Sequence, residues 1–158
     1  MNLREIVVQQ AIVPRLSAVD RDGVINELVG ALIDAGAAEP SAKDALVKKF
    51  LDREAKGSTG FGKGVAVPHV KHDSIPKMAA AIGLSAEGVD FNAYDRQPVY
   101  TVFLLLSPDD KPEEHLQAME VIFKNLSKDT FRRFLRQAGS VDEITELLTD
   151  ADEQRIGG

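Results

Sequence analysis

Apolar residues recur at helical spacing in two segments of the N-terminal third of the chain. Within residues 20–36 they form one stripe, made of Val24, Ile25, Leu28, Val29, Leu32 and Ile33. Gly36 is well placed to end that helix. A second amphipathic helix is predicted from Ser41 to about Lys56, with Ser41 and Asp44 as its capping pair. A short apolar piece, residues 11–16, precedes both helices.

The pattern changes to short apolar runs after Gly57. Residues 65–67 are β-prone, and residues 78–84 (MAAAIGL) suit a strand, although their alanines suit a helix equally well. Residues 99–106 (VYTVFLLL) are apolar at successive positions. This run predicts a central strand that is covered by helices on both faces.

Three further helices are predicted to close the chain. Their apolar positions are Leu116, Met119, Ile122, Phe123 and Leu126 in the first, Phe131, Phe134 and Leu135 in the second, and Val141, Ile144, Leu147 and Leu148 in the last. Ser140 and Glu143 form a capping box at the start of the last helix. Helices at both ends with strands between them predict a single α/β layered domain. The final residues, 151–158 (ADEQRIGG), are expected to be a frayed polar tail.

Composition excludes several classes of protein. The chain has 158 residues, a net charge of -6 and no cysteine. The negative charge argues against a nucleic-acid surface, and the absence of cysteine excludes disulfides and thiol chemistry. No apolar run approaches the roughly 20 residues that a spanning helix needs. We therefore expect a cytoplasmic protein that binds no nucleic acid and does not insert into a membrane.

A glycine-rich segment follows the second predicted helix. Residues 57–63 (GSTGFGK) match the nucleotide-binding pattern G-x-x-x-x-G-K, but Gly64 stands where a Ser or Thr would hold magnesium. The segment also follows a helix and enters a strand, whereas a phosphate loop does the reverse. Both differences disfavour ATP. Two interpretations stay open: a flexible loop, or a backbone cradle for an anion carried on another residue.

Three histidines are the candidate reactive groups. His69 follows Pro68, which cannot donate to a neighbouring strand, so His69 is predicted to leave the sheet at a strand end, where ligands often bind. His115 lies in the first turn of a predicted helix, where a lone histidine usually caps or packs. His72 suits a solvated loop. Together the three imidazoles could bind zinc with an open fourth position, although no supporting motif accompanies them.

Two separated motifs resemble one known family. The run REAKGSTGFGKGVAVPH, residues 53–69, is similar to the central motif of the IIA domain of the bacterial phosphoenolpyruvate-dependent phosphotransferase system, in its fructose/mannitol/nitrogen-regulatory class. Val67 replaces the usual Ile. LLLSPDDKPEEHLQAM, with His115 and Leu116, resembles the second signature, and FRRFLRQAGSVDEITELL resembles the closing helices. The resemblance covers residues 3–150 and leaves 151–158 as the tail.

The resemblance implies a mixed β-sheet flanked by helices on both faces, and a phosphoryl carrier that forms a phosphohistidine. It implies that His69 accepts the phosphoryl group, on Nε2, from a histidine-phosphorylated carrier protein. His115 would be the second active-site histidine and Arg53 the active-site arginine, while Ser58 and Thr59 would bind the phosphoryl group. It implies no metal and no cofactor. The acceptor would be a IIB domain or protein, or the phosphorylation state would act on regulated partners.

These residue types suit phosphoryl transfer. A neutral imidazole, the main form near pH 7, is the nucleophile, and the loose transition state mainly needs positioning and charge stabilisation. A chain without a IIB-like cysteine or a second domain slightly favours the nitrogen-regulatory role, and sugar transport stays open because sugar-specific IIA proteins also occur alone. Two alternatives stay open: a binding module that has lost phosphotransfer, and a three-histidine metalloenzyme.

Overall fold

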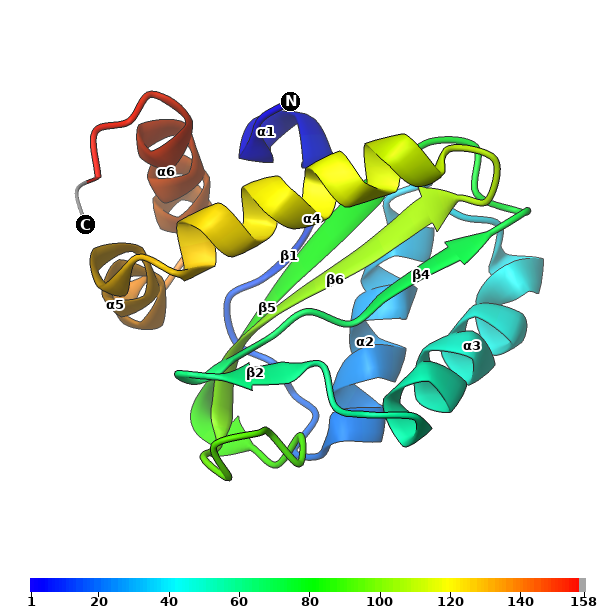
Figure 1. Ribbon diagram of the computed structural model, residues 1–158, viewed down its shortest axis with the longest axis horizontal. Coiled ribbons are helices and arrows are strands. Elements are labelled where there is room, and N and C mark those ends of the chain that lie inside the picture. Colours follow the sequence, from blue (N-terminus) through cyan, green and yellow to red (C-terminus); the bar gives the residue numbers. More distant parts are fainter. Residues whose placement is uncertain (157–158) are drawn as a thin grey trace.

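The computed structural model describes residues 1–156, in which a six-stranded mixed sheet lies between two layers of helices (Figure 1). The strands run in the order β1 (Val7–Val13), β5 (Ala79–Val89), β6 (Val99–Pro108), β3 (Val65–Ala66) and β2 (Gly60–Gly62). A further strand, β4 (His69–His72), pairs parallel with β6. Strands β5 and β6 are antiparallel, whereas β1 pairs parallel with β5 and β3 with β6. The predicted α/β fold with a mixed sheet is confirmed.

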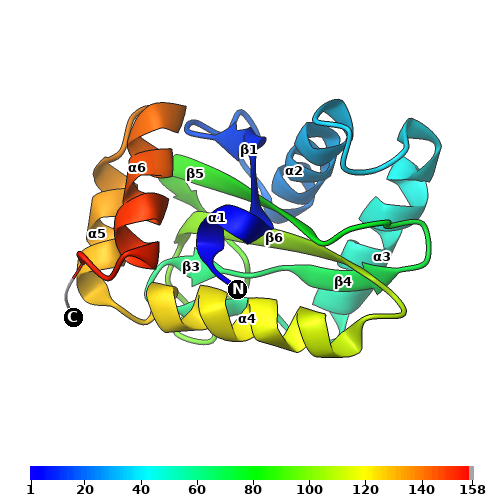
Figure 2. The same cartoon turned by 90° about the horizontal axis from the view of Figure 1, so that it is seen from above.

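Helices cover both faces of the sheet, as predicted (Figure 2). One face carries α2 (Arg21–Asp34) and α3 (Lys43–Ala55). The other face carries α1 (Leu3–Ile6), α4 (Pro112–Leu126), α5 (Asp129–Gln137) and α6 (Val141–Asp152). Strand β6 serves both layers: Leu104 and Leu106 join the core beneath α2 and α3, while Phe103 and Leu105 join the core beneath α4 to α6. This double burial explains why the strand is apolar at successive positions.

The helix ends confirm part of the predicted capping. Helix α6 has the Ser140 half of the predicted box, since Ser140 Oγ accepts a bond of 3.1 Å from the Glu143 N–H. The Glu143 carboxylate accepts the N–H of Gly139 at 3.1 Å instead of that of Ser140. The capping pair predicted for Ser41 and Asp44 is wrong, because Pro40–Ala42 form a 3-10 turn and α3 begins only at Lys43 without a side-chain cap. Proline suits the first position of such a turn, and Ser41 is therefore already inside it.

The structure differs from the prediction near both termini. The piece at residues 11–16 belongs partly to strand β1, which begins at Val7. The polar tail expected from residue 151 is wrong for the residues that the structure describes, because α6 continues to Asp152 and Ile156 packs into the core. The Asp152 carboxylate accepts the N–H groups of Leu3 at 2.7 Å and Arg4 at 2.9 Å, so the end of α6 is joined to α1. Residues 157–158 of the predicted tail lie outside the described residues.

The glycine-rich segment folds as a hairpin, so its interpretation as a flexible loop is wrong. Strands β2 and β3 are antiparallel and are joined at Lys63 and Gly64, whose φ angles are 59° and 78°. A two-residue hairpin turn of this kind needs positive φ at both positions, which Gly64 adopts without strain. The Phe61 ring in β2 packs edge-on against Phe123 of α4, with ring centroids 4.6 Å apart. The hairpin is thereby fixed against the helical layer.

Candidate functional site

His69 is the first residue of strand β4, and the prediction that it leaves the sheet is wrong. Pro68 cannot donate a hydrogen bond, but its carbonyl accepts one of 2.9 Å from the Leu105 N–H, and pairing with β6 continues at His69. The half-buried His69 ring places Nδ1 2.7 Å from the Val67 carbonyl oxygen. Because a carbonyl only accepts, Nδ1 carries the proton and Nε2 keeps a lone pair.

The ring of His115 lies beside that of His69, with the ring centroids 5.6 Å apart and the planes inclined by 44°. His115 lies near the start of α4 and is 7% exposed. Its Nδ1 is 2.6 Å from the hydroxyl oxygen of Ser107, a buried residue near the end of β6. The sequence-predicted pair of histidines is therefore brought together. Ser107 was not predicted, and the only signal for it is its place at a strand end shortly before the helix of His115.

The surroundings keep both rings neutral. Burial is the main cause that lowers the pKa of His69, and the positive charge of Arg53 lowers it further, while the hydrogen bond to Val67 opposes these effects. Burial is the main cause that lowers the pKa of His115 to about 4, followed by the positive charge that His69 carries when protonated and by the charge of Lys71. An imidazole with a lowered pKa has a free lone pair at neutral pH. The site is therefore suited to a histidine nucleophile beside a neutral histidine donor.

Arg53, in the last turn of α3, is held beside the glycine-rich hairpin. Its Nη1 donates a bond of 2.8 Å to the carbonyl oxygen of Gly57. The guanidinium makes no other hydrogen bond or ion pair within residues 1–156. Its remaining N–H groups are therefore available to an anion, and the planar guanidinium matches the oxygens of a phosphoryl group.

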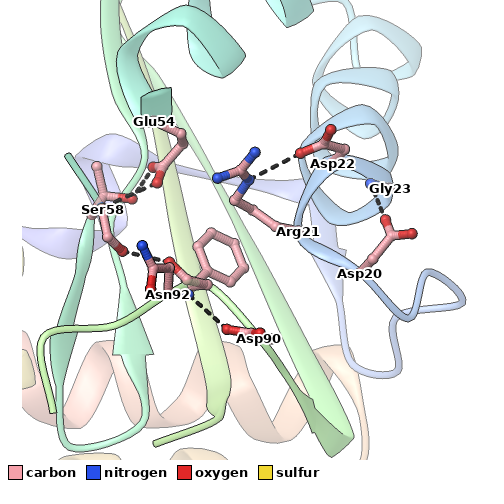
Figure 3. Close-up of polar contacts among 10 residues, drawn as sticks. Asp20, Arg21, Asp22, Gly23, Glu54, Ser58, Asp90 and Asn92 are labelled. Carbon is pink, nitrogen blue, oxygen red and sulfur yellow. Dashed lines mark hydrogen bonds and ion pairs between the residues drawn. The ribbon is translucent and has the colours of Figure 1, made fainter. Parts of the chain in front are cut away.

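The hydroxyl groups of Ser58 and Thr59 already have partners. Ser58 Oγ donates a bond of 2.6 Å to the Phe91 carbonyl, and Thr59 Oγ1 donates to the carboxylate of Glu54. Glu54 also accepts the Thr59 N–H at 3.1 Å, and Figure 3 shows Glu54 beside Ser58 at the start of this segment. Glu54 is 4% exposed, so the carboxylate is a buried anchor for the loop. Glu54 lies within the motif of residues 53–69, but the sequence alone predicts no role for it.

The three histidines do not form a metal site. His72 was expected in a solvated loop, which is wrong: it is the last residue of β4, and its Nδ1 lies 2.7 Å from the Ser74 hydroxyl. Among residues 1–156, no group of three His, Cys, Asp or Glu side chains is gathered so that it could hold a metal ion. Over the same residues, no helix is both long and apolar enough to cross a membrane.

Comparisons with known proteins show the family to which this chain belongs. Residues 5–151 match the family model described as "Phosphoenolpyruvate-dependent sugar phosphotransferase system, EIIA 2". The chain is 33% identical over 133 residues to the PTS system fructose-specific EIIA component of Haloferax volcanii, covering 84% of this chain and 85% of that protein. It is also 33% identical over 153 residues to a nitrogen regulatory protein of Bradyrhizobium diazoefficiens, covering 94% and 95%.

A longer relative matches as well. The chain is 31% identical over 153 residues to the PTS system fructose-specific EIIABC component of Bacillus subtilis, which covers 97% of this chain and 24% of that protein. The chain therefore spans about a quarter of the length of that relative.

Solved structures share the fold. Nitrogen regulatory protein IIA-Ntr from Neisseria meningitidis superposes with a TM-score of 0.82 at 28% identity, covering 91% of this chain and 97% of that one. Enzyme IIAMtl from Escherichia coli, solved in complex with phosphorylated IIBMtl, gives a TM-score of 0.75 at 25% identity, with coverage of 89% and 94%. The chain thus belongs to the EIIA 2 family of the phosphoenolpyruvate-dependent sugar phosphotransferase system.

Proposed function

We propose that this protein is a phosphoryl carrier that accepts the group on Nε2 of His69 from a histidine-phosphorylated carrier protein. The bond of 2.7 Å between His69 Nδ1 and the Val67 carbonyl supports this most directly. It holds the proton on Nδ1 and leaves the lone pair on Nε2. When Nε2 gains the phosphoryl group, the ring becomes cationic, and the same carbonyl stabilises the N–H that carries part of that charge.

The transfer step needs no bound metal or cofactor. The Nε2 lone pair of His69 forms the new N–P bond as the N–P bond of the donor phosphohistidine breaks, and the donor nitrogen keeps the electron pair. The developing charge lies on the three equatorial oxygens. His115 supplies an N–H from Nε2 when Ser107 donates its hydroxyl proton to Nδ1, and Arg53 supplies guanidinium N–H groups.

Ser58 and Thr59 are proposed to bind the phosphoryl group, but their hydroxyl groups must first leave their present partners. Their hydroxyl protons are bound to the Phe91 carbonyl and to Glu54. Direct contact with a phosphoryl oxygen requires each hydroxyl to exchange its partner. In their present arrangement, the two residues hold the hairpin in position beside Arg53.

We further propose that the phosphoryl group passes to a IIB partner or that its presence regulates other proteins, in the cytoplasm. The named relatives support both outcomes, since they include fructose-specific EIIA components and nitrogen regulatory proteins. The neighbour solved with phosphorylated IIBMtl supports a IIB partner. The superposition on IIA-Ntr supports the regulatory role, which we place first.

One reconstitution tests the proposal and its main alternative. The protein is incubated with phosphoenolpyruvate, the first enzyme of the system and its histidine carrier, and then with a purified IIB protein. A carrier takes up acid-labile, base-stable label, and a sugar-transport member passes that label to IIB. Retention of the label in the presence of IIB supports the regulatory role. Absence of any label, with IIB still bound, would show a binding module that has lost phosphotransfer.

A further inference from the structure

A basic cavity lies between the β2–β3 hairpin and helix α5, on the side of the molecule where the hairpin tip and α5 lie in Figure 1. Its volume is about 540 Å³. The residues that line it are Lys63, Asp129, Arg132, Arg133, Arg136 and Gln137. Four of these side chains are cationic and one is anionic, although the whole chain has a net charge of -6. Positive charge is therefore concentrated in this cavity, although the protein as a whole is negatively charged.

Two of the four cations are partly neutralised by neighbours. Arg132 donates to the Leu126 carbonyl at 2.7 Å and lies 3.3 Å from the Asp129 carboxylate. Arg133 lies 3.4 Å from the same carboxylate in an exposed ion pair, and such pairs are weak in water. Asp129 thus serves two arginines, and the cavity keeps an excess of positive charge.

The other two cations, Arg136 and Lys63, make no ion pair within residues 1–156. The Arg136 guanidinium carbon lies 3.7 Å from the centre of the Tyr100 ring, which holds the guanidinium in place without neutralising it. Lys63 lies at the hairpin turn, where its N–H is bound to Asp95 at 2.9 Å. The backbone of Lys63 is therefore fixed while its ammonium group stays free.

The charged surface continues beyond Arg136. This residue also lines an adjoining cavity of about 260 Å³, together with Arg15 and Tyr100. Helix α5 contributes its arginines from one side, and the hairpin contributes Lys63 from the other. Arginines of α5 and Lys63 of the hairpin thus line one recess, whose volume is that of a small-molecule site.

We propose that this recess binds a small molecule that carries at least two phosphate groups. Guanidinium groups pair with phosphate oxygens through two parallel N–H bonds, and several arginines that line one recess favour a multiply charged ligand over a single carboxylate. None of the cavity residues belongs to the site around His69, so the proposal is independent of phosphoryl transfer. A nucleoside diphosphate and a sugar bisphosphate share this chemistry.

Calorimetric titration of the intact protein with inorganic pyrophosphate tests the site. We expect one pyrophosphate per chain, bound at least ten-fold more tightly than orthophosphate. The double variant Lys63→Gln/Arg136→Gln should weaken pyrophosphate binding at least ten-fold. The matched control, Lys48→Gln/Lys56→Gln, removes the same charge from exposed positions on α3 and should bind like the parent. A His69→Ala variant should also bind normally, which separates this site from phosphotransfer.

Three further measurements complete the design. Arg136→Lys keeps the charge and loses the two-pronged geometry, so its affinity should fall between those of the parent and the double variant. Adenosine diphosphate and fructose 1,6-bisphosphate, titrated separately, identify which phosphorylated class the recess prefers. Thermal unfolding of each variant verifies that it is folded. Lack of pyrophosphate binding to the folded parent, an equal loss in the control, or tighter binding of a hexaglutamate peptide would overturn the proposal.

Discussion

The imidazole rings of His69 and His115 lie with their centroids 5.6 Å apart, although one belongs to strand β4 and the other to helix α4. Each ring is held through its Nδ1, by the Val67 carbonyl in one case and by the Ser107 hydroxyl in the other. Neither Nε2 is hydrogen-bonded within the described residues. The pair therefore offers one lone pair for attack and one N–H for charge stabilisation.

The two histidines should differ sharply when each is removed. His69→Ala should abolish phosphorylation, because the atom that forms the N–P bond is lost. His115→Ala should retain transfer at a rate lowered by about 10²–10³, the usual cost of one preorganised donor. The initial rate of label uptake from the carrier protein measures both effects. His72→Ala serves as the control and should behave like the parent, and equal losses in all three variants would contradict these roles.

Ser107 should act through His115. Ser107→Ala removes the hydroxyl that lies 2.6 Å from His115 Nδ1, so the ring loses its fixed orientation and tautomer. We expect the transfer rate to fall by about ten-fold, corresponding to the loss of one hydrogen bond. Nitrogen-15 NMR of the ring should also show a mixture of tautomers. Ser74→Ala breaks a similar bond to His72 and should change neither the transfer rate nor the tautomer of His115.

The charge of Arg53 should be visible in the titration of His69. Because that charge lowers the pKa of His69, Arg53→Gln should raise this pKa, while Arg53→Lys should leave it nearly unchanged. Both variants should slow transfer, since neither offers the guanidinium fork. Proton NMR of the histidine ring follows the pKa. Lys56→Gln provides the control, because it removes a positive charge three residues after Arg53. If it shifted the pKa of His69 as much as Arg53→Gln does, the effect of Arg53 would not be specific.

Stability should fall in acid because His115 resists protonation in the folded state. Its pKa is about 4 when folded, against 6.5 in an unfolded chain. As the pH falls from 6.5 to 4, the unfolded state takes up a proton that the native state does not, so the free energy of unfolding decreases. Relative to His115→Gln, the parent should lose about 1–3 kcal/mol over this range. Urea unfolding at several pH values measures the difference, and parallel curves would show that the ring titrates normally.

The sequence predicts the layered fold well because the spacing of apolar residues indicates which segments are helices or strands and which faces are buried. The six apolar positions of residues 20–36 became the buried stripe of α2, with Ile33 only partly buried. The apolar run 99–106 became the central strand β6. Strand β1 was harder to recognise because its polar Gln9 and Gln10 are exposed and interrupt the pattern. The burial of Ile156 depends on the tertiary core that it joins, which periodicity does not encode.

The site was predicted less completely than the fold. His69 and His115 were both identified, but their separation depends on the pairing of β4 with β6 and on the path of α4. Proline's missing N–H predicted a break in the sheet, whereas the Pro68 carbonyl keeps the strands together. Of the partners that hold the site, the Val67 carbonyl carries no sequence signal, and Ser107 has only its place at a strand end shortly before the helix of His115. Backbone groups and single serines acquire such roles only through the tertiary fold.

The position of the phosphoryl group tests the central claim most directly. The protein is phosphorylated through the carrier chain, and peptide mass spectrometry together with phosphorus-31 NMR locates the group. We predict one phosphoryl group per chain, on Nε2 of His69, with Nδ1 still protonated. A group on Nδ1 of that ring, on His72 or on His115 would contradict the account.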